Sequence, residues 1–214
     1  MGGVVPLTAR KLADFATTYA RQPGRARSDY VRWRRDRRLP TLVARRPWWP
    51  YVAVEAVEAA LPARARVVEY GGGGSTLWLL DRGATVVCIE HDRDWAATLT
   101  EEADGRAELR LVEPSTSGEV SSGGLFYDDY VTAVADLPDG SQDLVIVDGR
   151  ARVACGLAAM SKVRPGGMLL LDDSDRARYE GLREALAGWR GQDYRGLKLG
   201  GGPVFQTSVW TRPN

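Results

Sequence analysis

Residues 66–80, which read RVVEYGGGGSTLWLL, decide the fold. The run at residues 66–70 is short, apolar and rich in valine, which is typical of a buried strand. Four glycines follow it, and residues 75–81 predict a helix with Ser75 at its N-cap. Glycines between a strand and a helix let a ligand approach the main chain closely. No lysine follows these glycines, so a P-loop is excluded.

The alternation of strand and helix continues through the rest of the chain. Further strands are predicted at residues 85–90, 107–112, 143–147 and 167–171, and helices at 92–103, 126–135, 153–163 and 179–189. Apolar strands separated by helices are typical of a parallel sheet that is covered on both faces. The last two predicted strands, 194–199 and 204–211, are joined by GGGP, which is too short for a parallel crossover. We therefore expect an α/β fold: a Rossmann-like, doubly wound, mostly parallel seven-stranded sheet with an antiparallel terminal hairpin.

The first fifty residues differ in charge from the rest. They hold twelve basic and three acidic side chains, a net charge of +9, whereas the other 164 residues hold 17 basic and 25 acidic ones, a net charge of −8. Apolar residues recur there at helical spacing: Leu12, Phe15, Ala16 and Tyr19. We expect a basic helical cap at residues 1–50 and the sheet domain at 51–214. We also expect the arginines of the cap to pair within the molecule rather than to bind nucleic acid.

Composition excludes several classes of protein. Hydrophobic residues make up 44% of the chain, so disorder of the whole chain is excluded. No apolar run approaches the roughly 20 residues that span a bilayer, and MGGVVPLTAR is unlike a secretory signal. Cys88 and Cys155 lie in apolar stretches without metal-ligand spacing, which predicts reduced thiols and a cytoplasmic location.

Two carboxylates lie close to the predicted ligand edge. Glu90 ends the second strand, 21 residues after Glu69, where a carboxylate can accept hydrogen bonds from two ribose hydroxyls. Glu69 opens the glycine stretch, where an acidic side chain would repel a pyrophosphate but suits a cationic ligand. His91, the only histidine, adjoins Glu90 and is expected to line the cofactor pocket rather than to act as a base.

Four stretches together resemble the class I S-adenosylmethionine-dependent methyltransferases: EYGGGGST (69–76), CIEHD (88–92), DLVIVDG (143–149) and RPGGMLLLDD (164–173). The resemblance covers about residues 61–212. VDGRARVAC (147–155) and LDDSDRARY (171–179) look like a subgroup that is found among small-molecule enzymes. The resemblance implies S-adenosylmethionine as cofactor, with the methionine part at Glu69, Gly71 and Gly73, its carboxylate at Ser75 and Thr76, and the ribose at Glu90. His91 and Asp148 are further expected cofactor-binding residues.

An acidic trio is expected at the same edge of the sheet. Asp148 ends the fourth strand, and Asp172 and Asp173 end the fifth. Three carboxylates favour a hard cation, so a Mg²⁺ site like that of catechol-type O-methyltransferases stays open. Against it stand four arginines near enough in sequence to neutralise the trio: Arg150, Arg152, Arg176 and Arg178. Without a metal, Asp148 or Asp173 is the candidate general base, and Tyr179 is expected to face the substrate.

Three functions remain open on the sequence alone. The first is methyl transfer to an oxygen or nitrogen of a small molecule in specialised metabolism. The second is attack by the cofactor's own amine, which gives azetidine-2-carboxylate and methylthioadenosine. The third is docking of an RNA or a carrier-bound substrate on the basic cap. A small-molecule substrate is favoured over nucleic acid, no membrane partner is expected, and a homodimer is left open. Trp48, Trp49 and Tyr51 either close over the pocket or pack as a hinge.

Overall fold

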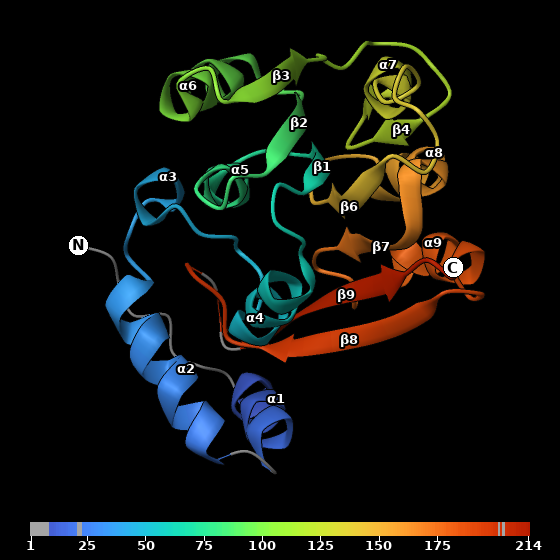
Figure 1. The fold of residues 1–214 in the computed structure, drawn as a ribbon. Coiled ribbons are helices and arrows are strands. Elements are labelled where there is room, and N and C mark those ends of the chain that lie inside the picture. The colour runs from blue at the N-terminus through green and yellow to red at the C-terminus, as the bar shows by residue number, and fades with distance from the viewer. Residues whose placement is uncertain (1–8, 21–22, 201, 203) are drawn as a thin grey trace.

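The computed structural model describes residues 9–20, 23–200, 202 and 204–214, with the side chains of residues 9–11 excepted. Its centre is a seven-stranded sheet in the order β3-β2-β1-β6-β7-β9-β8 (Figure 1). The strands are β1 Arg66–Tyr70, β2 Thr85–Glu90, β3 Ala107–Leu111, β6 Gln142–Val147, β7 Val163–Leu171, β8 Arg190–Gly196 and β9 Phe205–Thr211. The first five are parallel, and β9 runs antiparallel to both β7 and β8. The predicted fold is confirmed.

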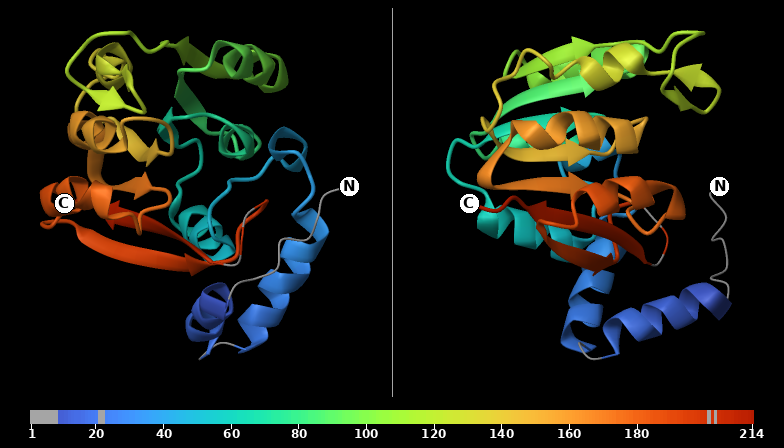
Figure 2. Two further views of the ribbon diagram at one scale, coloured as in Figure 1. Left: turned by 180° about the vertical axis from the view of Figure 1, so that it is seen from behind. Right: turned by 90° about the vertical axis from the view of Figure 1, so that its right-hand side faces the viewer.

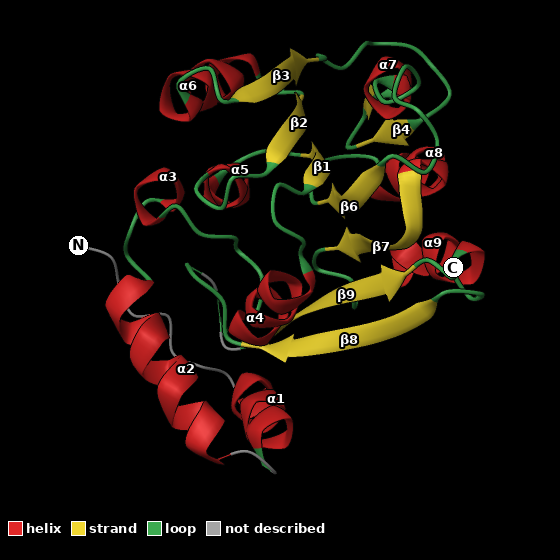
Figure 3. Cartoon of the chain, viewed as in Figure 1, coloured by secondary structure: helices red, strands yellow, loops and turns green. Residues whose placement is uncertain are grey.

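Helices cover both faces of the sheet (Figures 1 and 3). One face carries α4 Tyr51–Ala60, α5 Gly74–Leu80 and α6 Arg93–Ala103, and the other carries α7 Asp128–Thr132, α8 Arg152–Ala159 and α9 Glu180–Ala185. Successive strand residues supply the two cores in turn: Val67 packs with Leu77 and Leu99 on the first face, and Val68 packs with Tyr130 and Leu182 on the second. This double burial explains why the strands are continuously apolar.

The carboxyl ends of β1, β2, β6 and β7 lie at one edge of the sheet, because these strands are parallel. In the right-hand view of Figure 2, a small hairpin projects beyond the upper part of the molecule. This hairpin consists of β4 Ser121–Ser122 and β5 Leu125–Phe126, and no strand was predicted there; Phe126, the first residue of the helix predicted at 126–135, lies in β5. The Asp128 carboxylate accepts hydrogen bonds from the backbone N–H groups of Glu119 and Val120, which fixes the base of the hairpin.

The N-terminal helices are α1 Ala9–Tyr19, α2 Pro23–Asp36 and α3 Thr41–Ala44. The Tyr19 hydroxyl donates to Asp29 at 2.8 Å and accepts from the backbone N–H of Leu197 at 3.0 Å. It thereby ties α1 to α2 and to the segment that follows β8. Residues 1–8 of the predicted cap, and residues 201 and 203 of the predicted GGGP connection, lie outside the described residues.

Several cap arginines pair with the sheet domain, although not at the carboxyl edge of the sheet. Arg25 and Arg32 contact Glu55 on α4, and Arg45 forms a bidentate pair with Asp81 at the end of α5. These pairs hold the cap against the helices of one face. The opposite charges of the two regions are therefore used, at least at these positions, between packed helices.

The aromatic residues before α4 mostly pack as a hinge. Trp49 is fully buried, with its ring centroid 6.3 Å from that of Trp78, and Tyr51 is buried with Tyr19 and Leu197. Trp48 is 45% exposed and lies against Gly200. None of the described helices is both long and apolar enough to span a membrane.

Candidate active site

In the glycine loop, residues 71–74, the chain after β1 lies close against the chain after β6. Gly71 has φ +85°, a left-handed conformation that favours glycine, and a Cβ there would lie 2.6 Å from the Cα of Gly149 after β6. A Cβ at Gly74 would lie 2.4 Å from the backbone oxygen of Arg46, so the cap also presses on the start of α5. Larger residues at these two positions would force the main chains apart.

Glu69 is fully buried beneath this loop. Its carboxylate accepts hydrogen bonds from the hydroxyls of Ser75 and Thr76 at the start of α5, and Thr76 Oγ1 in turn accepts the backbone N–H of Gly73 at 2.9 Å. Burial raises the pKa of Glu69 to about 7, although the two hydroxyls lower it. The hydroxyls of Ser75 and Thr76, predicted to meet the cofactor carboxylate, are thus directed to Glu69.

Glu90 ends β2 and is 2% exposed. Its Oε1 accepts the backbone N–H groups of His91 at 2.7 Å and Asp92 at 3.0 Å, and lies 2.7 Å from Nδ1 of His91. Its Oε2 accepts the backbone N–H of Gly72 at 3.1 Å. Burial raises the pKa of Glu90, but these hydrogen bonds outweigh it and hold the pKa below its usual value, so the group is a fixed anion.

His91 lies in an aromatic corner. Its ring centroid is 5.8 Å from that of Tyr127 and 5.9 Å from that of Tyr130, both edge-to-face. Arg150 Nε donates to His91 Nε2 at 3.3 Å. His91 therefore links the end of β2 to the loop after β6, a position consistent with a wall of the cofactor pocket.

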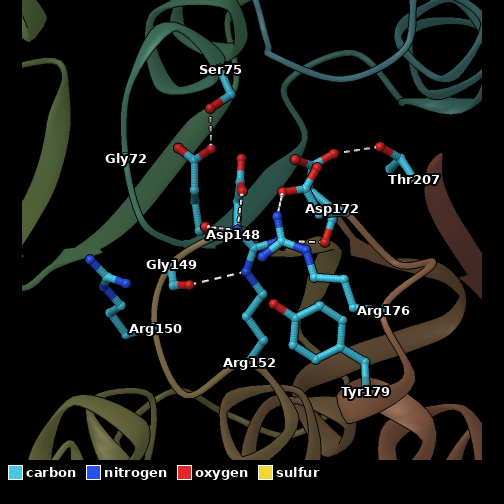
Figure 4. A network of polar contacts seen from close by, with 12 residues as sticks. Gly72, Ser75, Asp148, Gly149, Arg150, Arg152, Asp172, Arg176, Tyr179 and Thr207 are labelled. Atoms are coloured by element: carbon cyan, nitrogen blue, oxygen red, sulfur yellow. Dashed lines mark hydrogen bonds and ion pairs between the residues drawn. The ribbon is translucent and has the colours of Figure 1, made fainter. Parts of the chain in front are cut away.

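Asp148 and Arg152 form the centre of the polar network that Figure 4 shows. Arg152 Nη2 contacts both the carboxylate of Asp148, at 2.9 Å, and its backbone oxygen, at 2.7 Å. The same guanidinium donates to the backbone oxygens of Gly149 and Asp172. Burial, together with the neighbouring carboxylate of Asp172, raises the pKa of Asp148 well above its usual value.

The metal site that the sequence left open at Asp148, Asp172 and Asp173 finds no support. Lys198 Nζ lies 3.3 Å from Asp172 and 3.0 Å from Asp173, so an ammonium already occupies the position between these two carboxylates. Asp172 also accepts from the Thr207 hydroxyl at 2.6 Å, and Asp173 pairs with Arg176. No cluster of at least three His, Cys, Asp or Glu side chains in the described residues could hold a metal.

Tyr179 is buried at the end of the short helix η2 Ala177–Tyr179. The guanidinium carbons of Arg152 and Arg178 lie 5.7 and 5.0 Å from the centroid of its ring, and Arg178 also donates to its hydroxyl at 3.0 Å. Tyr179 lines a hollow of about 620 Å³ between the β4–β5 hairpin and α8. It is the predicted substrate-facing residue that the structure places on an open cavity.

Sequence reasoning missed two residues that shape the candidate site, Lys198 and Trp95. Lys198 follows β8, and neither a motif nor a charge pattern distinguishes it. Trp95, in the first turn of α6, donates from Nε1 to the backbone oxygen of Gly72 at 2.8 Å and so fixes the glycine loop. An aromatic residue in the first turn of the predicted helix, five residues after Glu90, was the available signal for Trp95.

Comparisons with known proteins show the fold. No protein-family model matches the chain, and no curated protein matches it by sequence. A methyltransferase-like protein from Silicibacter pomeroyi is 26% identical and has a TM-score of 0.51, with 79% of this chain and 89% of that chain covered. The fold is that of the S-adenosylmethionine-dependent methyltransferases.

Two further structures with this methyltransferase fold were crystallised with the cofactor or its product. The O-methyltransferase TomG of Streptomyces achromogenes, involved in tomaymycin synthesis, was crystallised with S-adenosylmethionine; it is 17% identical, with a TM-score of 0.56 and 75% and 77% of the two chains covered. An O-methyltransferase of Bacillus cereus, in complex with S-adenosylhomocysteine, is 18% identical, with a TM-score of 0.55 and coverage of 74% and 78%.

Proposed function

We propose that this chain transfers a methyl group from S-adenosylmethionine to an oxygen or nitrogen of a small molecule. The observation that carries the proposal is the pair of buried carboxylates, Glu69 and Glu90, on either side of the glycine loop. Neither has a lysine or arginine partner in the described part of the chain. Buried acids without a lysine or arginine partner suit a ligand that brings its own positive charge and its own hydroxyl donors.

Glu90 fits the ribose of such a ligand. Its Oε1 is occupied by two backbone N–H groups and the ring of His91, whereas its Oε2 accepts the N–H of Gly72. Each carboxylate oxygen has two lone pairs, so Oε2 retains capacity for a further hydroxyl donor. The low pKa of Glu90 keeps it an acceptor at neutral pH.

Glu69, Gly71 and Gly73 would hold the methionine part. Here Ser75 and Thr76 act through Glu69, because their hydroxyls fix the position of its carboxylate. A bound cation would also favour the ionised form of Glu69, which burial disfavours when the site is empty. When bound, the cofactor supplies an electrophilic methyl group on a sulfonium.

Asp148 is the better of the two candidate bases. Burial and the neighbouring carboxylate of Asp172 raise the pKa of Asp148 well above its usual value, so the ionised form of Asp148 is the stronger base of the two. For Asp173 the net effect is opposite: burial raises its pKa, but Lys198 and Arg176 outweigh this and hold it low. We therefore assign proton removal from the acceptor to Asp148. Asp173 instead holds the ammonium of Lys198 in place. The remaining work of the site is alignment of the acceptor with the methyl group.

Calorimetry with S-adenosylhomocysteine tests the cofactor assignment. We expect the protein to bind it, Glu90→Gln to weaken binding by about tenfold or more because a charged acceptor is lost, and Glu101→Gln on the exposed face of α6 to have no effect. Absence of binding, or equal affinity in both variants, would refute the assignment.

Incubation with S-adenosylmethionine, with mass analysis of the nucleoside product, separates transfer from cyclisation. S-adenosylhomocysteine formed only with an acceptor supports methyl transfer. Methylthioadenosine formed without an acceptor would instead establish cyclisation. Because Lys198 and Arg176 pair with Asp172 and Asp173, a chelator is expected to leave the rate unchanged.

A further inference from the structure

The hollow beside Tyr179 lies next to the glycine loop but has a lining of its own. Its walls come from the β4–β5 hairpin, the first two turns of α8 and the segment after β7. Among the described residues, its lining does not include Glu69, Glu90 or any member of the stretch 71–75. At about 620 Å³ it has the size of a site for a small molecule.

Positive charge dominates this hollow. Four arginines line it, Arg150, Arg152, Arg176 and Arg178, and no acidic residue is among its described lining residues. Two of the arginines are already engaged, since Arg152 contacts Asp148 and Arg176 contacts Asp173. Their charge is largely neutralised within the network of Figure 4.

Arg150 and Arg178 are different. Both are exposed at the hollow, and neither has a carboxylate partner among the residues that the structure describes. Arg150 donates to His91, and Arg178 donates to the hydroxyl of Tyr179. A guanidinium has five N–H donors, so both side chains retain donors for a ligand. Planar pairs of donors of this kind match a carboxylate or a phosphate.

The rest of the lining suits an apolar ligand body with polar substituents. Val153, Ala154 and Leu157 of α8 form one wall, and Ser121 and Ser122 of the hairpin stand on another. Such a mixture of apolar wall and a few polar groups is common in sites for small organic molecules.

We propose that the acceptor of the methyl group carries an anionic group, a carboxylate or a phosphate, which Arg150 and Arg178 bind in this hollow. That the anionic ligand is a methyl acceptor rests on the proposed function. Two contacts place the hollow beside the cofactor loop: Arg150 reaches His91 next to Glu90, and Gly149 borders both the hollow and Gly71.

The test uses the full chain and three probes in calorimetry at low salt: inorganic phosphate, benzoate, and benzamide as the neutral match of benzoate. We expect phosphate or benzoate to bind more tightly than benzamide, and the affinity to fall about tenfold in Arg150→Gln and in Arg178→Gln. Arg195→Gln, an equal loss of charge on exposed β8, should match the parent protein. Binding of phosphate alone would indicate a phosphorylated acceptor, and binding of benzoate alone a carboxylic acid.

The inference is overturned if both anions bind no better than benzamide, or if the variant that lacks both arginines binds them as the parent does. Titration of S-adenosylhomocysteine into Arg178→Gln separates the two proposals. An unchanged affinity supports an acceptor site, whereas a loss as large as that for the anions would assign the hollow to the cofactor. If the parent binds the anions but not S-adenosylhomocysteine, the proposed function fails and the anion site stands.

Discussion

The two sides of the sheet edge handle buried charge in opposite ways. Around the glycine loop, Glu69 and Glu90 are satisfied by hydroxyls and backbone N–H groups from nearby residues of the chain. Around Asp148, Asp172 and Asp173, each carboxylate instead has an arginine or lysine partner. The first arrangement leaves room for an external cation, and the second is already neutral. Under the proposed function, the positive ligand binds at the loop, and the ion pairs of the other side fix the positions of its carboxylates, including the proposed base Asp148.

Among the variants considered, removal of Lys198, on the Asp148 side of the edge, should lower the free energy of unfolding most. Lys198→Met leaves Asp172 buried with Thr207 as its remaining partner, and we expect the free energy of unfolding to fall by about 3–5 kcal/mol. Urea denaturation measures it. Lys162→Met, which breaks a surface pair with the 69% exposed Asp139, is the matched control and should cost about 0–1 kcal/mol.

The double variant Lys198→Met/Asp172→Asn should recover part of this loss, because the unpaired charge is then gone. Equal losses for Lys198→Met and Lys162→Met would show that the buried pair does not stabilise the edge as we infer.

A methyl group at Gly71 would disrupt the packing of the glycine loop against Gly149. Gly71→Ala combines left-handed strain with a Cβ that meets the backbone of Gly149, and we expect a loss of about 3 kcal/mol together with weaker binding of S-adenosylhomocysteine. Gly83→Ala is the control: its φ is +77°, but nothing lies within 4 Å of the added Cβ. Its cost should be the strain alone, about 1–2 kcal/mol. Similar losses in both variants would contradict the close approach of the two loops.

The smallest expected change in the free energy of unfolding is its pH dependence, which reports the protonation of Glu69 on the glycine-loop side. Burial raises the pKa of Glu69 from 4.5 to about 7, so the folded protein binds this proton more tightly than the unfolded chain. The contribution is therefore complete below about pH 4.5 and is lost as the pH rises through about 7. Relative to Glu69→Gln, the parent should lose about 1 kcal/mol per pH unit between pH 5 and 6.5. A constant difference across that range would contradict an uncharged Glu69 in the free protein.

Sequence reasoning worked best where neighbouring residues determine the structure. The strand at residues 66–70, the glycines and the following helix lie in one stretch, which placed Glu69 in advance. The end of the next strand, at residues 85–90, placed Glu90 and His91 in the same way. The strand ends at Asp148 and Asp172 were also predictable, because parallel strands share one edge.

The sequence was less informative where contacts come from distant or polar segments. β8 begins at Arg190 rather than at 194, because its first residues, RGQD, are exposed on an edge strand and show no apolar alternation. β7 begins at Val163 although Pro165 and Gly166 suggest a turn there. Lys198 reaches the acidic pair through an irregular segment that a bridge to Pro50 holds in place, which no local pattern encodes.

The order of the last three strands has a consequence for biosynthesis. β9 follows β8 in the chain, yet it lies between β8 and β7. While a ribosome is still making β9, β8 has no strand to join, and the buried strand β7 keeps one edge without hydrogen-bond partners. Open edges of this kind invite pairing with other chains. The nascent protein therefore passes through a stage in which aggregation competes with folding, and this stage ends only when β9 inserts.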